Sequence, residues 1–249
     1  SYNYFIRCAP VGEEAYPILR KARYRVLRDY APSYPRIMSM WAFNDTVLSS
    51  PTDLAGYSYL ILAEWQSYKY RDQIFSARAI NPNLKVVNSQ DLTYGFKGSN
   101  FVKFLLSEAD DPTSPLYNCL VCRTGGGPID IPFWNHPMFN FVDDTCRKLI
   151  ANRILSYWRR NLTTIDGLYF DRVQNALTYL YDDTIPLDID RNGTTDDRGY
   201  IDSVWVDGLH QTLEYIRANM PDALLGGNDA YWWIYGDLLN GKCFEMNVN

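Results

Sequence analysis

Short apolar runs alternate with segments of helical pattern along most of the chain, and this alternation limits the possible folds more than any other feature. The runs that we expect to be strands cover residues 35–43, 59–64, 84–88, 116–122, 166–173, 223–228 and 242–247. Helices are expected between them, over residues 68–80, 100–108, 143–161, 204–219 and 230–239. Repeated strand–helix units with short connections predict a parallel sheet with helices packed outside it.

The number of these units favours an α/β fold of the (β/α)₈ TIM-barrel type over an open doubly wound sheet. Seven strands are evident in the 249 residues, and the eighth is expected either after Asn249 or from residues 2–8. No GxGxxG follows the first strand, and the glycines at 125–127 do not precede a helix, which disfavours a dinucleotide-binding fold. We predict that residues 1–34 form an N-terminal extension and that residues 35–249 form the barrel domain.

The charge balance and the hydrophobic pattern exclude two classes of partner. Lys and Arg number 24 against 29 Asp and Glu, a formal net charge of −5, whereas a nucleic-acid-binding domain needs a basic face. No run approaches the roughly 18 apolar residues that span a bilayer. Aromatic residues make up 15% of the chain. Such rings either fill a large core or line a surface that stacks on sugars.

A polar residue recurs at or near the end of five of the seven expected strands, namely Glu64, Asn88, Asp171, Asn228 and Glu245. In a parallel barrel, reactive groups lie at these carboxyl ends. Side chains alternate along a strand, so Asp171 shares a face with Tyr169, while Leu168 and Phe170 share the other and should pack on outer helices. Asp171 is therefore expected to point into the barrel mouth, and by the same alternation Glu245 faces inward with Asn247.

Two carboxylates at one barrel mouth suit glycosidic cleavage. That reaction needs a proton donor at the leaving oxygen and a second carboxylate as nucleophile or as the base that activates water. Glu64, Asn88, Asn228 and Asn247 would bind sugar hydroxyls, and Trp41 and Trp65, which follow apolar runs, would stack on sugar rings. The alternative is that each carboxylate caps a loop or pairs with a neighbour such as Arg172.

Several segments together resemble a known family. The chain contains Trp134-Asn135-His136-Pro137, a long helix, and then Asp166-Gly167-Leu168-Tyr169-Phe170-Asp171. Asn81-Pro82-Asn83 precedes the third expected strand, and Gly241-Lys242-Cys243-Phe244-Glu245 opens the last one. In this order the segments resemble the hypothetical glycosyl hydrolases related to the endo-α-1,4-polygalactosaminidase type, over about residues 35–247.

The resemblance implies a TIM-barrel glycosidase or carbohydrate-active protein that is extracellular or at the cell surface. Asp171 and Glu245 match the family's presumed catalytic acids. Residues 1–34 and the loop at 182–202 have no counterpart in the resemblance. Three sequons, at Asn44, Asn161 and Asn192, are weak additional support for secretion.

The loop at residues 188–196 carries the D-x-D-x-N-G pattern that opens a calcium loop. The spacing of Asp188, Asp190 and Asn192 directs their oxygens around one point, and Gly193 permits the sharp turn. The twelfth position is Gly199 instead of a bidentate Glu, and Asp196 is a candidate substitute. We predict a weak calcium site of Asp188, Asp190, Asn192 and Asp196. The alternative is an acidic solvated turn.

The five cysteines leave at least one thiol that is free or paired between chains. Cys119 and Cys122 form a CxxC, but in the expected strand residues three apart point to opposite faces. No second pair completes a zinc set. We therefore interpret these cysteines as structural, with their pairing open.

The sequence thus predicts an extracellular glycoside hydrolase that acts on a polysaccharide or oligosaccharide with Asp171 and Glu245. Two other classes stay open. One is a non-catalytic carbohydrate-binding or structural surface protein that retains the barrel and self-assembles. The other is a metal-dependent hydrolase that uses an Asp/Glu cluster.

Overall fold

The computed structural model of the chain describes residues 38–40, 45–131, 135–177, 184–228, 230 and 232–243. The expected extension at 1–34, and the expected eighth strand at 2–8, lie outside these residues. Within them, six strands form one sheet in which every neighbouring pair is parallel. The strands are β1 (Met38–Met40), β2 (Tyr59–Leu62), β3 (Lys85–Asp91), β7 (Gly167–Asp171), β9 (Leu224–Asn228) and β10 (Gly241–Cys243).

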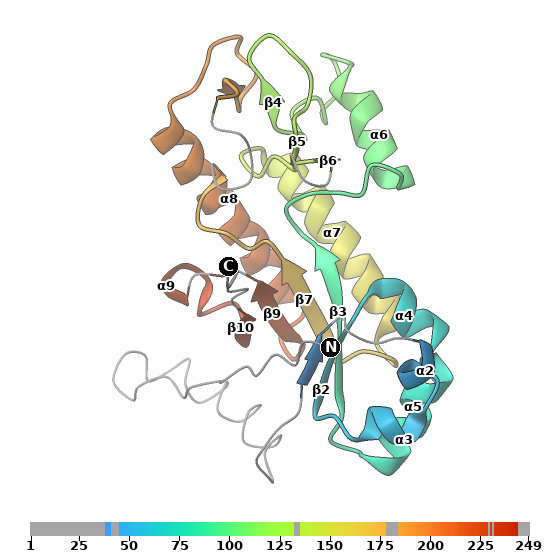
Figure 1. Cartoon of the computed structure of the whole chain (residues 1–249). Coiled ribbons are helices and arrows are strands. Elements are labelled where there is room, and N and C mark those ends of the chain that lie inside the picture. Colours follow the sequence, from blue (N-terminus) through green and yellow to red (C-terminus); the bar gives the residue numbers. More distant parts are fainter. Residues whose placement is uncertain are drawn as a thin grey trace.

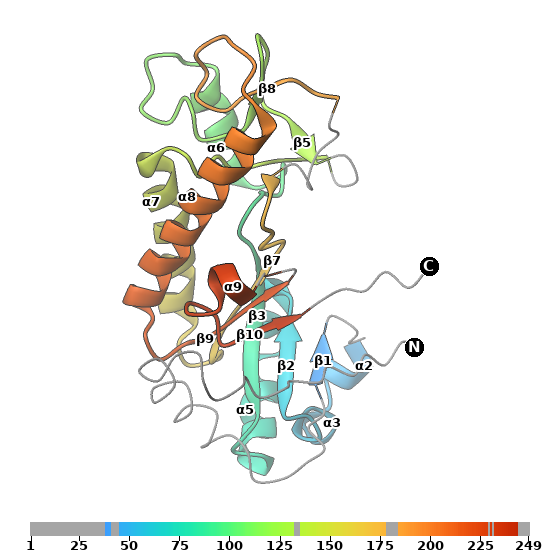
Figure 2. The same cartoon turned by 90° about the vertical axis from the view of Figure 1, so that its left-hand side faces the viewer.

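The spatial order of these strands follows their order in the sequence, β1-β2-β3-β7-β9-β10. A doubly wound sheet reverses its strand order at a switch point, and the sheet described here has no such reversal among its six strands. In both views the edge strands β1 and β10 come near each other, so the sheet is strongly curved (Figures 1 and 2). The fold is therefore α/β with a singly wound parallel sheet.

Helices follow the strands as the alternation predicts, with local signals that start them. Asp143 accepts a hydrogen bond from the backbone N–H of Cys146 (3.0 Å) at the start of α7, and Asp197 accepts one from Tyr200 (3.1 Å) at the start of α8. The helices are α2 (Asp45–Leu48), α3 (Pro51–Ala55), α4 (Glu64–Lys69), α5 (Arg71–Ile80), α6 (Asn100–Ala109), α7 (Asp144–Asn161), α8 (Arg198–Asn219) and α9 (Trp232–Tyr235). None of the helices described here is both long and apolar enough to cross a bilayer.

The two faces of the sheet are buried against different parts of the molecule. Leu168 and Phe170 are fully buried in the main hydrophobic cluster with residues of α7 and α8, as their alternation predicts. On the opposite face the register aligns Ile61, Val87, Gly167 and Leu224, and Tyr169 shares this face two residues further along β7; all are buried. A sheet buried on both faces explains why its strands read as near-continuous apolar runs.

A cap lobe, made of residues 92–131, 135–142 and 184–197, lies beyond the carboxyl ends of β3 and β7 (Figure 1). It contains α6 and two small antiparallel ladders. The ladders pair β4 (Cys122–Arg123) with β8 (Leu187–Asp188) and β5 (Asp130–Ile131) with β6 (His136–Pro137).

The strand expected at 116–122 is wrong, because this segment belongs to the cap lobe. The N–H of Val121 donates to the carbonyl of Met138 (3.0 Å), and its own carbonyl accepts from Ile129 (2.9 Å). A disulfide joins Cys119 to Cys146 in the first turn of α7. The backbone is therefore bonded within the lobe, and β3 pairs directly with β7 in the main sheet.

Gly208 should be sensitive to substitution, because the middle of α8 touches the chain that enters α7. A Cβ on Gly208 would lie 1.9 Å from the carbonyl oxygen of Phe141. We expect Gly208→Ala to lower the free energy of unfolding by about 3 kcal/mol, measured by urea denaturation. Gly199→Ala in the same helix meets only a side-chain oxygen at 3.2 Å and is the matched control. Equal stability of Gly208→Ala and the wild type would contradict this packing.

The disulfide should also contribute to stability. It closes a loop with a sequence separation of 27 residues, for which chain entropy gives about 3.5 kcal/mol. We expect the Cys119→Ala/Cys146→Ala double variant to lose roughly this amount, and reductant to destabilise the wild type much more than the double variant. Equal sensitivity of the two proteins to reductant would show that the bond is not formed.

Candidate active site at the carboxyl edge of the sheet

Asp171, the last residue of β7, is surrounded by hydrogen-bond donors. Its Oδ1 accepts from the amide Nδ2 of Asn228 (2.8 Å) and from the backbone N–H of Arg172 (3.0 Å). Its Oδ2 accepts from the hydroxyl of Tyr94 (3.1 Å). Three donors suit an ionised carboxylate, which can only accept. They also fix the orientation of the carboxylate at the edge where the parallel strands end.

A second carboxyl group stands beside Asp171 on the neighbouring strand. The register of β3 and β7 pairs Asp91 with Asp171, so their side chains leave the same face of the sheet at the same level. Burial raises the pKa of Asp91, and the negative charge of Asp171 raises it further. The Tyr94 hydroxyl and the positive charge of Arg153 act in the opposite direction. The net effect is a raised pKa of Asp91, beside an Asp171 whose three partners are all donors.

Tyr94 stands beside these two carboxyl groups. The residue is buried at 7% exposure, its hydroxyl donates to Oδ2 of Asp171 (3.1 Å), and Asp91 is close enough to act on its pKa. Burial is the main reason why the pKa of Tyr94 is raised far above its usual value, and the two carboxylates add to the effect. Tyr94 is therefore a neutral hydroxyl donor at any physiological pH.

Groups from α7 and the cap lobe complete the surroundings. Burial lowers the pKa of Arg153, while the charges of Glu64 and Asp91 raise it; its guanidinium also stacks 4.6 Å from the Phe101 ring centroid. His136 stacks on Tyr94 with ring centroids 6.0 Å apart. The edge thus combines two carboxyls with one half-buried cation and an imidazole.

Buried polar atoms without a hydrogen-bond partner gather near this edge. Buried side-chain polar atoms are nearly always paired in folded proteins. Thr93 and His136 belong to the cap lobe. Asn175 follows β7, and Asn228 is the last residue of β9. The atoms without a partner are Thr93 Oγ1, His136 Nδ1, Asn175 Oδ1 and Asn228 Oδ1. Such a concentration is typical of a site that is completed by a polar ligand.

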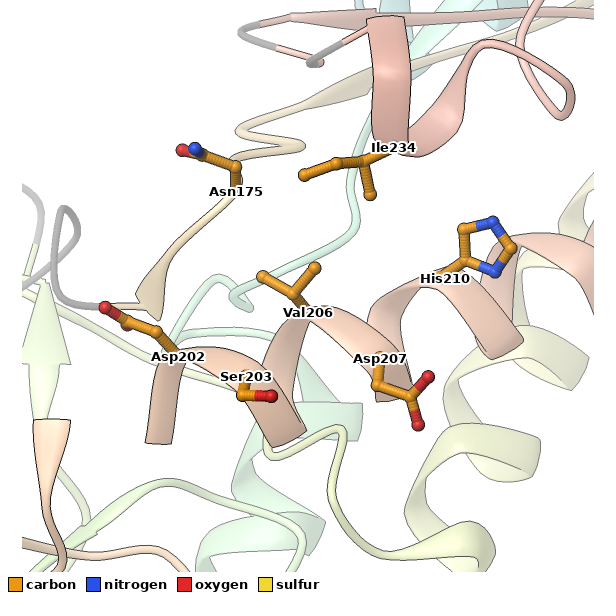
Figure 3. A pocket seen from close by; sticks show the side chains of 7 residues that line it. All are labelled: Asn175, Asp202, Ser203, Val206, Asp207, His210 and Ile234. Atoms are coloured by element: carbon orange, nitrogen blue, oxygen red, sulfur yellow. The ribbon is translucent and has the colours of Figure 1, made fainter. Parts of the chain in front are cut away.

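A hollow of about 480 Å³ opens beside the connection that follows β7 (Figure 3). Asn175 lines it from this connection, and Ile234 of α9 lies across from α8. The residues of α8 that line it are Asp202, Ser203, Val206, Asp207 and His210. Asn175 is only four residues after Asp171, so the hollow begins close to the carboxyl edge of the sheet. A ligand bound at that edge can extend into it.

Two residues expected at the barrel mouth are placed differently. Asn88 lies three residues before the end of β3 and is fully buried on the helix-facing side. Its Oδ1 accepts from Ser67 (2.8 Å) and Tyr157 (2.6 Å), and its Nδ2 donates to the carbonyl of Leu62 (3.1 Å). These bonds join β3 to α4 and α7, which is a structural role.

Glu64 is not the last residue of β2, because the strand ends at Leu62 and Glu64 begins α4. The Oε1 of Gln66 accepts from the N–H of Ala63 (2.9 Å) and so starts the helix earlier than the apolar run suggests. The side chain of Glu64 is exposed, and its negative charge raises the pKa of Arg153. Of the remaining expected residues, Asp171 and Asn228 are in direct contact, while Trp41, Glu245 and Asn247 lie outside the described residues.

Sequence reasoning missed Asp91 and Tyr94. The apolar run ends at Asn88, but β3 continues through Ser89-Gln90-Asp91 in register with β7. The available signal was the alternation of this segment, which puts Val87, Ser89 and Asp91 on the face that the paired strand gives to Asp171.

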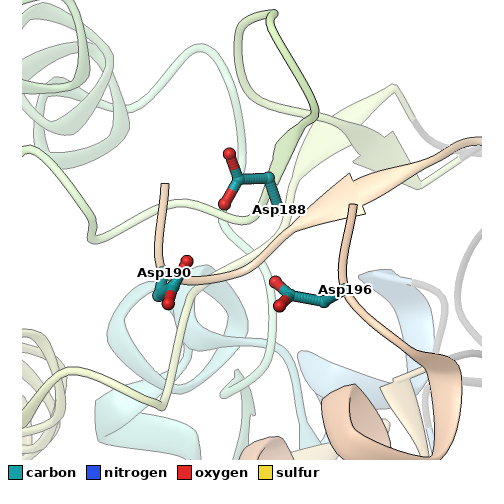
Figure 4. A group of neighbouring side chains, drawn as sticks. All are labelled: Asp188, Asp190 and Asp196. Atoms are coloured by element: carbon teal, nitrogen blue, oxygen red, sulfur yellow. The ribbon is translucent and has the colours of Figure 1, made fainter. Parts of the chain in front are cut away.

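The acidic loop of the cap lobe brings three carboxylates together (Figure 4). Oxygens of Asp188, Asp190 and Asp196 all lie within 4.8 Å of one another, so the cluster could hold a metal ion. Asp188 is 4% exposed and accepts from the N–H groups of Asn192 (2.9 Å) and Gly193 (2.8 Å). Gly193 has a φ of +91°, the conformation that the sharp turn requires.

Comparison with known proteins identifies the fold. No protein-family model matches the sequence, and no curated protein matches it. The structure is similar to the GH36 α-galactosidase AgaA from Geobacillus stearothermophilus, with a TM-score of 0.58 and 9% identity over 88% of this chain and 31% of that enzyme. The chain thus has a glycosidase-like fold and spans about a third of that enzyme.

Two other solved structures show weaker likeness. The glycoside hydrolase domain of PelA from Pseudomonas aeruginosa has a TM-score of 0.48 and 12% identity, over 84% of this chain and 66% of that one. The α-galactosidase TtGalA from Thermus thermophilus has a TM-score of 0.49 and 12% identity, over 91% and 47%. The likeness to AgaA supports a glycosidase fold and not specifically the polygalactosaminidase type.

Proposed function

We propose that the chain is a glycoside hydrolase that cleaves a polysaccharide or oligosaccharide at the carboxyl edge of a (β/α)₈-type barrel. The observation that carries this proposal is the oriented carboxylate of Asp171, held by Asn228 and Tyr94 among buried polar atoms that lack partners. Sugar hydroxyls both donate and accept hydrogen bonds, so they suit these atoms. The curved, sequentially ordered parallel sheet supports the barrel.

In the proposed reaction, Asp171 is the nucleophile or the base and Glu245 is the general acid, or the two roles are reversed. A separation of about 5 Å between the carboxyls goes with retention of configuration, and one of about 6.5–9.5 Å goes with inversion. The free Oδ1 of Asn228 would accept a hydrogen bond from a sugar hydroxyl. Asn247 and Trp41 would extend the substrate site.

We also propose an extracellular or cell-surface location. The disulfide between Cys119 and Cys146 supports it, because such bonds persist in oxidising compartments. Cys122 is buried, and burial raises the pKa of its thiol to about 11, which keeps it unreactive there.

The acidic loop would hold calcium. Carboxylate and amide oxygens are the ligands that Ca²⁺ prefers, and Asp188, Asp190 and Asp196 offer three carboxylates around one point. Asn192 completes the set expected from the sequence. The ion would neutralise a cluster that includes the buried Asp188 and would fasten the β8 turn of the cap lobe.

The catalytic proposal is tested by reducing-end release from a glycan panel. We expect Asp171→Asn and Glu245→Gln each to lower the rate by about 10²–10⁴-fold, because each removes a group needed for acid–base or nucleophilic catalysis. Asp110→Asn changes an exposed carboxylate and is the matched control. Full activity of both site variants would refute the assignment. Glycan binding without cleavage by the wild type would instead support a non-catalytic carbohydrate-binding protein.

The calcium proposal is tested by titration calorimetry on the full chain with CaCl₂. We expect binding with a rise in melting temperature, and we expect Asp188→Asn to abolish both, because it removes a buried ligand charge. Asp197→Asn, next to the cluster but outside it, is the control. No heat with calcium and no effect of chelator on the melting temperature would remove the site.

A further inference from the structure

We infer that Asp91 is a positioning residue of the candidate site, which acts through the hydroxyl of Tyr94 to hold Asp171 as an oriented carboxylate. This inference rests on the proposed function, since it assigns a role within the same site. It adds a third carboxyl group to the pair expected from the sequence, and it gives Tyr94 a defined task.

The geometry supports this unit in two ways. Asp91 and Asp171 are direct register partners on adjacent parallel strands, so the backbone of the sheet fixes their spacing. Tyr94 is three residues after Asp91, and the backbone there is anchored by two hydrogen bonds to the cap lobe. Phe139 donates to the carbonyl of Thr93 (2.9 Å), and Gly95 donates to the carbonyl of Pro137 (3.1 Å). The backbone on both sides of Tyr94 is thus fixed, and its hydroxyl is bonded to Asp171.

The placement of hydrogens follows from the donor count. A phenol has one hydrogen, and Tyr94 donates it to Oδ2 of Asp171. In the proposed arrangement the carboxyl of Asp91 keeps its proton and donates it to the phenol oxygen, which leaves the phenol hydrogen for Asp171. A neutral Asp91 also avoids placing two negative charges side by side at a half-buried edge.

The charges around Asp91 agree with this arrangement. The groups that influence it from the packed elements are Asp171 of β7, Tyr94, Arg153 of α7 and His136 of β6. Burial and Asp171 raise the pKa of Asp91, and they outweigh Tyr94, Arg153 and His136. Loss of Asp171 should therefore make Asp91 easier to ionise, because the repulsion between the two carboxylates disappears.

The direct test is carboxyl ¹³C NMR on the full chain with labelled Asp, which requires no substrate. We expect the Asp91 resonance, assigned with Asp91→Asn, to titrate above the ordinary midpoint of about 3.9. Asp171→Asn should move that midpoint downward, whereas Asp110→Asn should leave it in place. Titration of Asp91 at the ordinary midpoint, or a midpoint that ignores Asp171→Asn, would overturn the inference.

Kinetics then separate positioning from simple stability. On a glycan that the wild type cleaves, we expect Asp91→Asn and Tyr94→Phe to lower kcat about tenfold or more with KM little changed, because a misplaced carboxylate lowers the rate of the chemical step. An unchanged kcat in both folded variants would contradict the role. If the wild type cleaves nothing, the proposed function fails, and the NMR titration still decides whether the three groups form one unit.

Discussion

The pairing of β3 with β7 is the constraint on which the candidate site depends. This register aligns Val87 with Gly167 and, four residues later, Asp91 with Asp171. A shift of one residue would move every side chain to the other face, and the carboxyl groups would part. On its other side β7 pairs with β9, where a Cβ on Gly167 would lie 1.8 Å from the carbonyl oxygen of Leu224. The glycine before the Leu-Tyr-Phe-Asp run therefore permits the close strand approach that brings Asn228 to Asp171.

The cap lobe contributes the other half of the site. It brings Tyr94 and His136 over the carboxyl edge, and contacts with α7 and α8 hold it in place. The Cys119–Cys146 disulfide joins it to α7. Arg191 ties its two segments together by donating to the carbonyls of Ala109 (2.9 Å) and Tyr117 (2.7 Å). Because the lobe is fastened at these points, the phenol beside the two carboxyls has a fixed position.

Much of the sheet could be predicted from the sequence because its strands are buried on both faces. Alternation in the segment from Gly167 to Asp171 correctly separates Leu168 and Phe170 from Asp171, and the apolar run at 223–228 is confirmed as β9. The long helix expected at 143–161 is confirmed as α7, which begins one residue later because Asp143 is its N-cap.

The remaining errors have a common physical origin, since they arise where tertiary contacts decide. The end of β3 is polar, and pairing with β7 alone extends it to Asp91. The apolar segment at 116–122 looks like a barrel strand, but hydrogen bonds and a disulfide within the cap lobe place it elsewhere. α4 starts at Glu64, where the Oε1 of Gln66 accepts a hydrogen bond from the N–H of Ala63. Composition and periodicity carry no information about such long-range partners.

The separation of the carboxyl groups of Asp171 and Glu245 in a crystal structure tests the central claim most directly. The account predicts a distance of about 5–9.5 Å, with both groups facing one solvent-accessible opening at the carboxyl edge of the sheet. A distance well beyond that range, or a Glu245 sealed beneath packed side chains, would contradict a glycosidase site.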